Sequence, residues 1–228
     1  MERWVFIGAV DKRDLLLYIS KVLASSGHRV LLIDATDKGK YRYVIGGIVE
    51  EEELIEFNGF DVARVGTNIG DVHINSYDYC LYDIDHVSQN NGQLWSIAEK
   101  ITWVASYDRY EIAESIDFFS QLFRIWPQLQ GMKVHSVFTR TMDSHVDERY
   151  VMSLMDQLPI EWISTEIRVP WDEINMAVQT ENEHSQTLRM NRITRVYKRA
   201  LTDLITQLGG WEIKTVKRAF RKAERRKA

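Results

Sequence analysis

The sequence predicts an α/β protein whose mostly parallel sheet is covered by helices on both faces. Short apolar runs of strand length alternate with stretches whose apolar residues recur at helical spacing. The first of these segments, residues 3–36, form a strand–helix–strand unit, which implies parallel pairing and a right-handed crossover. Only three prolines occur in 228 residues, and no Gly/Ser-rich run divides them. Alternation of this kind in an undivided chain is typical of a three-layer α/β fold.

The elements can be placed in order from their residue patterns. Residues 3–8 form an apolar strand, residues 14–25 an amphipathic helix, and the segment ending at Asp34 a second apolar strand. A short strand pair is expected around Asn58 and Gly59. The later elements are strands at 77–85, 133–141 and 160–165, a strand and a long helix within 100–123, and helices at 146–157, 188–208 and 211–226.

The charge is distributed unevenly along the chain. Residues 187–228 hold 13 Lys/Arg and three Asp/Glu, a net charge of +10, so residues 1–186 carry −14 of the total −4. We therefore expect an α/β domain at 1–186 and a basic helical arm at 187–228, packed on it or extending from it. No run reaches the roughly 18–20 apolar residues that span a bilayer. The single Cys80 and the charged start indicate a cytoplasmic protein without a signal peptide.

The loop between the first strand and the first helix is the first candidate site. It reads Gly8-Ala9-Val10-Asp11-Lys12-Arg13-Asp14. Ligands of open α/β sheets bind outside the carboxyl ends of the strands. Lys12, Asp34, Asp83 and Asp85 are all expected at that edge.

Several ordered segments resemble the MinD/ParA family of deviant P-loop ATPases. They are "IGAVDKRD" at 7–14, "RVLLIDAT", "YDYCLYDID" and the stretch beginning "VFTRT". The resemblance covers residues 3–185 and implies the family's three-layer fold. It places Gly8 at the family's first loop glycine and Lys12 at its phosphate-binding lysine. Arg13 stands where the family has a magnesium-binding hydroxyl, and Asp34 and Asp83 match its strand-end acids.

The loop departs from the family pattern in ways that disfavour a triphosphate. The second and third glycines are replaced by Ala9 and Asp11, although backbone N–H groups cradle phosphate best where glycine permits close approach. Two like charges about 4 Å apart repel by roughly 1–4 kcal/mol at effective dielectrics of 80 to 20. Asp11 and Asp14 have the spacing of a capping box and are expected to hold the helix start in place of phosphate. On this interpretation Lys12 is one solvated charge beside them.

Other chemistry is not indicated. The six histidines lack metal-ligand spacing, and Cys80 within an apolar strand is typical of a core residue. We predict no catalytic residue, no metal and no cofactor, with ATP and magnesium retained only in an alternative interpretation.

The basic arm is the second candidate site. Arg189, Arg192, Arg195 and Arg199 are predicted to follow one face of a helix. The next helix sets its apolar residues, Ile213, Val216 and Phe220, against Lys214, Lys217, Arg218 and Arg221. The arm resembles the basic amphipathic membrane helix of the MinD branch. It predicts attachment to protein or to an anionic membrane, with DNA a weaker candidate.

Together these features predict a non-hydrolysing pseudo-ATPase that positions, recruits or scaffolds a larger assembly, such as a pilus, secretion or division apparatus. Its expected partners are other proteins and further copies of itself, with peripheral attachment to the inner face of the membrane as one option. Two alternatives stay open. One is an active ATP-dependent switch that uses Lys12, Asp34 and Asp83, and the other is a DNA-partition or DNA-binding protein that uses the arginines of the arm.

Overall fold

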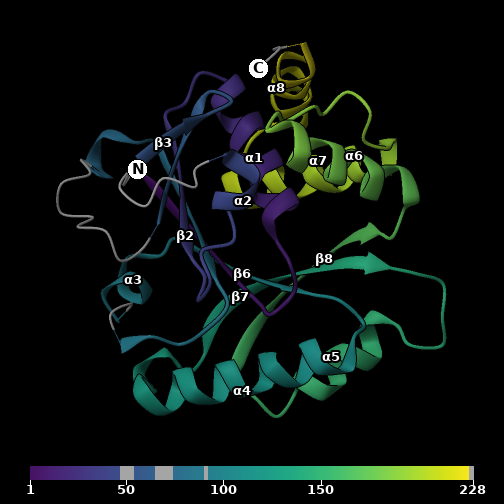
Figure 1. Ribbon diagram of the computed structural model, residues 1–228. Helices are drawn as coiled ribbons and strands as arrows, with labels where there is room; N and C mark the ends of the chain where they lie inside the picture. The colour runs from purple at the N-terminus through teal and green to yellow at the C-terminus, as the bar shows by residue number, and fades with distance from the viewer. Residues whose placement is uncertain (47–53, 65–73, 90–91, 226–228) are drawn as a thin grey trace.

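The computed structural model describes residues 1–46, 54–64, 74–89 and 92–225. One eight-stranded sheet crosses the molecule in the order β3-β4-β2-β5-β1-β6-β7-β8. All neighbouring strands are parallel except β3, which pairs antiparallel with β4. The predicted α/β architecture with a mostly parallel sheet is confirmed (Figure 1).

The strands are β1 (Glu2–Ile7), β2 (Val30–Ala35), β3 (Leu54–Phe57), β4 (Phe60–Arg64), β5 (Tyr79–Ile84), β6 (Lys100–Ala105), β7 (Met132–Thr141) and β8 (Ile160–Pro170). The helices are α1 (Arg13–Ser25), α2 (Arg42–Ile45), α3 (Gly92–Ile97), α4 (Arg109–Ile125), α5 (Glu148–Met155), α6 (Glu173–Ser185), α7 (Arg195–Gly209) and α8 (Ile213–Arg225).

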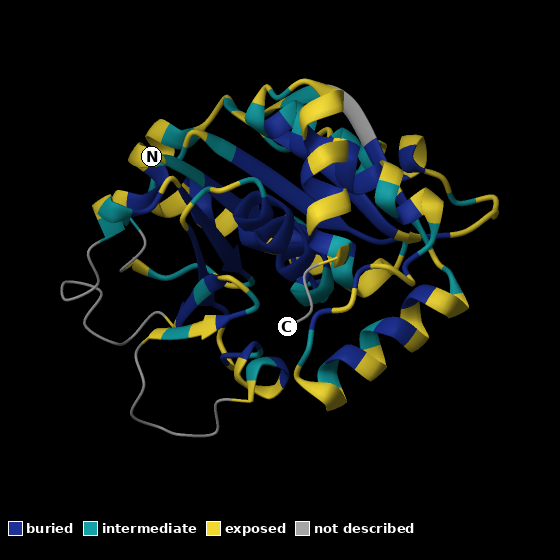
Figure 2. Ribbon diagram, turned by 90° about the horizontal axis from the view of Figure 1, so that it is seen from above, coloured by how far each residue is buried: buried dark blue, intermediate teal, exposed yellow. Residues whose placement is uncertain are grey.

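Helices cover both faces of the sheet and create two hydrophobic cores. On one face α1, α7 and α8 pack over the strands, and on the other face α4 and α5 do so (Figure 1). Strand β1 shows why both faces need cover, since Trp4 and Phe6 enter the first core whereas Val5 and Ile7 enter the second. The strands are accordingly buried, while the outward faces of the helices are exposed (Figure 2).

The strand pair at Asn58 and Gly59 forms as predicted. Asn58 has φ 54° and Gly59 φ 92°. Positive φ at both central residues is what a two-residue hairpin turn between twisted strands requires. The antiparallel pair β3–β4 therefore closes one end of the sheet.

The segment after β7 departs from the sequence-based prediction in three places. Strand β8 continues to Pro170 instead of ending near residue 165. Helix α6 was not predicted; it buries only Asn175, Val178 and Asn182, so its sequence lacks an apolar stripe. The helix predicted at 188–208 begins only at Arg195, because Thr194 caps its first turn by accepting from Tyr197 N.

The C-terminal helices are part of the main body. Eleven consecutive residues of α1, Leu15–Ser25, are buried, and α7 and α8 pack against that helix. Residues of α7 and α8 belong to the same core as Trp4 and Phe6. One continuous core thus joins the segment predicted as an arm to the α/β layers.

Candidate functional site

The site lies at the carboxyl edge of β1, β2 and β5. The loop between β1 and α1 begins at Gly8, which has φ 145° and lies against β6. A Cβ at Gly8 would stand 2.1 Å from the carbonyl oxygen of Val104. The neighbouring strand is therefore enough to require glycine here.

Lys12 is turned inward and is only 1% exposed. Its Nζ donates to the carbonyl oxygens of Gly8 and, at 3.4 Å, of Val10. It also forms an ion pair with Asp83 Oδ1 at 2.9 Å. The interpretation of Lys12 as a solvated charge beside Asp11 and Asp14 is wrong. Because an ammonium group has three N–H donors, these three acceptors are sufficient to occupy it.

Asp34 and Asp83 stand side by side, since they are register partners in β2 and β5. Tyr41 contacts both of them: its hydroxyl donates to Asp83 Oδ2 at 2.8 Å, and its backbone N–H donates to Asp34 Oδ2 at 3.1 Å. Thr36 N also donates to Asp34 Oδ1, at 3.1 Å. Tyr41 is 1% exposed, so one buried residue engages both strand-end acids, Asp83 through its hydroxyl and Asp34 through its backbone N–H.

Burial sets the protonation of this cluster. Desolvation raises the pKa of Asp83, although the charge and hydrogen bonds of Lys12 and the hydroxyl of Tyr41 oppose the rise. Desolvation and the nearby carboxylate of Asp83 raise the pKa of Tyr41 well above its ordinary value. Tyr41 is therefore a neutral donor at any physiological pH.

Asp11 is held by its neighbour Arg13. The guanidinium reaches both carboxylate oxygens, with Nε 3.0 Å from Oδ1 and Nη2 2.7 Å from Oδ2, and Arg13 N donates to Oδ1 at 3.1 Å. A second carboxylate, Glu183 of α6, lies 3.4 Å from Nη2. Burial opposes ionisation, but the hydrogen bonds and charge of Arg13 hold the pKa of Asp11 below its ordinary value. The loop thus contains an internal bidentate ion pair between Arg13 and Asp11.

The predicted capping box does not form in the expected way. The N-cap of α1 is Lys12, which makes no side-chain capping bond. Asp11 serves the backbone N–H of Arg13, but Asp14 accepts the hydroxyl of Tyr197 on α7 at 2.6 Å. Burial raises the pKa of Asp14, and Tyr197 only partly offsets it. The pair is divided because α7, which packs beside α1, offers Asp14 a closer donor.

A second group of charges lies next to the cluster. Asp85 accepts from the backbone of Asp37 at 2.9 Å, pairs with Lys40 at 3.0 Å, and lies 3.1 Å from His86 Nδ1. Among the residues that the structure describes, no three His, Cys, Asp or Glu side chains gather as metal ligands.

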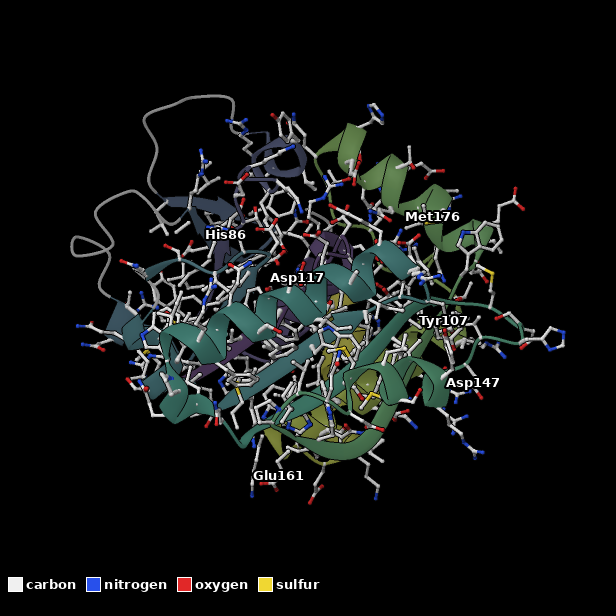
Figure 3. All side chains as sticks on the ribbon, turned by 90° about the horizontal axis from the view of Figure 1, so that it is seen from below. His86, Tyr107, Asp117, Asp147, Glu161 and Met176 are labelled. Carbon is white, nitrogen blue, oxygen red and sulfur yellow. The ribbon has the colours of Figure 1, made fainter. Side chains whose placement is uncertain are left out.

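The loop after β6 is tied to the opposite helical layer. Tyr107 donates to the buried Glu148 at the start of α5, and Arg168 of β8 pairs with the other oxygen of Glu148 at 2.5 Å. Figure 3 labels Tyr107 together with Asp147, the N-cap of α5, which directly precedes Glu148 in the sequence. Nearby, Arg140 Nη2 bonds Glu111 at 3.2 Å. Tyr107 of this loop is therefore held by Glu148 of α5, and Arg168 of β8 in turn holds Glu148.

A small cavity of about 110 Å³ opens beside Asp11 and Asp14. It is lined by Asp11, Asp14, Thr139, Arg140, Val169, Pro170, Trp171, Asp172, Asn175, Met176, Gln179 and Tyr197. Small-molecule sites usually enclose about 300–1,000 Å³. This hollow is thus too small for a nucleotide in the present arrangement.

The structure separates the residues predicted for the basic arm. Arg189 and Arg192 precede α7 instead of lying on it, and Arg192 pairs with Glu181. The side chains of Lys214, Lys217, Arg218 and Arg221, together with Arg195 and Arg199 of α7, are exposed.

Phe220 and Val216 do not face a partner or a lipid. They are 5% and 0% exposed, because this side of α8 packs on the body. The prediction of an apolar face free for attachment is wrong for Val216 and Phe220, whereas Ile213 at the start of α8 is 49% exposed beside the basic face.

Sequence reasoning missed Tyr41, Tyr197 and Glu183. They reach the site from the N-cap of α2, from α7 and from α6, and no local pattern marks them. One signal was present for α6: Asp172 directly after Pro170 and Trp171 is a typical N-cap, and it accepts from Ile174 N and Asn175 N. Recognising that helix start would have placed Glu183 on a helix.

Comparison with solved structures identifies the fold. The MinC:MinD cell division protein complex of Aquifex aeolicus aligns with a TM-score of 0.64 and 17% identity, covering 93% of this chain and 97% of that one. Cyanothece McdA, solved as an ATP complex, gives 0.60 and 12% over 93% and 97%. A ParA family ATPase from Chlorobium tepidum TLS gives 0.57 and 12% over 97% and 98%.

The chain therefore has the fold of the MinD/ParA P-loop ATPases over nearly its whole length. No protein-family model and no curated protein matches the sequence. In the part of the chain that the structure describes, none of the helices combines the length and apolar content needed to cross a bilayer.

Proposed function

We propose that this chain is a non-hydrolysing MinD/ParA-like protein that positions, recruits or scaffolds a larger cellular assembly. The observation that carries the proposal is the state of Lys12. In P-loop ATPases this lysine neutralises phosphate, which requires a free ammonium group facing the ligand. Here the group is buried and engaged by Gly8, Val10 and Asp83.

Two further features support the same proposal. The Asp11 carboxylate lies in the phosphate loop and is bound by the Arg13 guanidinium. Arg13 stands where the magnesium-binding hydroxyl is expected, and its side chain is already engaged by Asp11. Tyr41 engages both strand-end acids, donating its hydroxyl to Asp83, which matches the acid that holds magnesium through water, and its backbone N–H to Asp34. Binding of Mg-ATP would require all three arrangements to be broken together.

The scaffolding part of the proposal rests on relatives of the same fold. The names of the solved neighbours describe cell division and plasmid partition proteins, and one of them was solved together with its partner MinC. A protein that keeps this fold without the chemistry retains surfaces for partners. We place it in the cytoplasm, with peripheral membrane attachment as a subordinate option.

The test is calorimetric titration of the full chain with ATP and magnesium at millimolar concentration, with a MinD ATPase measured in parallel as the positive control. We expect no heat of binding and no phosphate release from this chain. A micromolar dissociation constant would overturn the proposal in favour of the active switch. The scaffolding role is tested separately, by deleting the gene and asking whether one assembly loses its position while its components persist.

A further inference from the structure

The exposed face of α8 carries an unusual excess of positive charge. The opposite face of α8 packs on the body. Six basic residues lie on the exposed face: Lys214, Lys217, Arg218, Arg221, Lys222 and Arg225. Within the described part of the chain, none of these six has an ion-pair partner. Like charges four residues apart destabilise a helix by about 0.2–0.5 kcal/mol per pair. Repulsion among the basic residues of α8, with no acidic partner to offset it, indicates that this face is used to bind a partner.

A groove concentrates part of this charge. It lies between α7 and α8, has a volume of about 960 Å³, and is lined by Arg195, Lys198, Arg199, Thr202, Asp203, Ile213, Lys217, Phe220, Arg221 and Glu224. Five of these residues are basic and two are acidic. Both acids already have a neighbour, since Glu224 pairs with Lys198 at 2.6 Å and Asp203 lies 4.0 Å from Arg199. Arg195, Lys217 and Arg221 are left facing an open hollow.

The groove also has an apolar part. Phe220 is 5% exposed, and Ile213 at the start of α8 is 49% exposed. The best-fitting occupant is therefore an acidic segment flanked by apolar side chains. Nucleic acid fits less well, because a phosphate backbone carries no apolar group to cover the exposed Ile213. A flat bilayer cannot enter a hollow.

The chain itself contains a segment of this description. Residues 48–54 read Ile-Val-Glu-Glu-Glu-Glu-Leu, four consecutive carboxylates between aliphatic residues. Strand β3, which begins at Leu54, is the terminal strand of the sheet, and Leu54 is 40% exposed.

We propose that the acidic run Glu50–Glu53 of one copy docks into the α7–α8 groove of a second copy. The two surfaces are different, so the contact is head-to-tail and generates rings or open chains instead of a closed symmetric dimer. This inference goes beyond the proposed function, because it holds whether or not the chain binds a nucleotide.

The experiment compares two charge-matched variants by sedimentation velocity. The groove variant carries Arg195→Glu, Lys217→Glu and Arg221→Glu, and the control carries Lys214→Glu, Arg218→Glu and Lys222→Glu on the part of α8 outside the groove. We expect the groove variant to weaken self-association about tenfold or more and the control to change it about twofold at most, since generic charge acts alike in both. Circular dichroism verifies that each variant is folded.

A charge-swap experiment is the decisive test. A chain with Glu50, Glu51, Glu52 and Glu53 all changed to Lys should lose self-association, and mixing it with the groove variant should restore association between the two. The proposal is overturned if the unmodified chain stays monomeric up to about 100 µM, where a micromolar contact would be saturated. It is also overturned if both triple variants lose association equally. A third result would also overturn it: binding of a DNA duplex or of phosphatidylglycerol vesicles that is lost in the groove variant, in a chain that shows no self-association.

Discussion

Lys12, Asp83 and Tyr41 form a buried group in which Lys12 forms an ion pair with Asp83 Oδ1 and the Tyr41 hydroxyl donates to Asp83 Oδ2. The two charges are almost completely buried, at 1% and 2% side-chain exposure. Taking two ions out of water costs several kcal/mol for each ion, which mutual attraction and hydrogen bonds must offset. Removing one of the two charges therefore costs much more stability than the intact pair contributes, because the other charge is left buried and unpaired.

Lys12→Met tests this dependence. Removal of the ammonium leaves Asp83 as an uncompensated buried carboxylate, and we expect the free energy of unfolding to fall by about 3–5 kcal/mol. The double variant Lys12→Met, Asp83→Asn removes both charges and should recover a large part of the loss. Urea denaturation of the three proteins measures it, and equal destabilisation of the single and double variants would contradict the coupling.

Asp14→Asn tests the pH dependence of the site. Burial raises the folded-state pKa of Asp14 above 3.8, so its protonated form is favoured by folding. The stability that this proton contributes is fully present below about pH 3.8 and is lost as the pH rises through the folded pKa. The variant should therefore gain stability relative to the natural chain over that rise. Unfolding free energies across the range give the difference.

Tyr197→Phe is the control for that measurement. It removes the hydroxyl that stabilises the charged form of Asp14, so it should shift the pH window upward. If the difference between Asp14→Asn and the natural chain is independent of pH, Asp14 does not titrate as argued.

At the scale of elements, the junction of β1 and α1 is determined by the strand beside it. Gly8 and Gly27 bracket helix α1, and both have positive φ, at 145° and 104°. They differ in their surroundings, because an added Cβ meets Val104 O at Gly8 and has no atom within 4 Å at Gly27. This difference makes the two glycines a matched pair.

Gly8→Ala and Gly27→Ala separate backbone strain from collision. At Gly27 only strain is added, about 1–2 kcal/mol for an L-residue at positive φ. At Gly8 the same strain is joined by a backbone clash with β6, so we expect a clearly larger loss of unfolding free energy. Thermal and urea unfolding of both variants compare them, and equal losses would show that β6 yields at little cost.

At the scale of the whole molecule, the C-terminal helices and the α/β layers share one core. Val216, Ala219, Phe220 and Ala223 of α8 are all buried in it. A full loss of the Phe220 side chain removes about 3–5 kcal/mol, against a typical total stability of 5–15 kcal/mol. The two regions therefore should unfold together.

Deletion of residues 211–228 tests this cooperativity. We expect a large loss of stability or of folding, and not an intact body without its arm. Phe220→Ala should lower the unfolding free energy by about 3–5 kcal/mol, whereas Lys217→Ala on the exposed face should change it by about 0.5 kcal/mol at most. An unchanged urea midpoint in the truncated chain would contradict a shared core.

Sequence reasoning reached the fold because the relevant signals are local. Alternating apolar runs and helical spacing specify strands and helices within windows of ten to twenty residues, and the crossover rule then orders them into a parallel sheet. The same rule brings the ends of β1, β2 and β5 together. It follows that Lys12, Asp34 and Asp83 could be assigned to one edge from the sequence by itself.

Tertiary packing decided what these residues do at that edge. Tyr41 engages Asp34 and Asp83, Tyr197 takes Asp14 away from the helix cap, and the body buries the apolar face of α8. Asp14 and Tyr197 are 183 positions apart, so no periodicity relates them. A local pattern shows which residues are apolar or charged. It does not show which residue each charged group pairs with, because that depends on which groups the fold buries together and on the cost of burying a polar group without a partner.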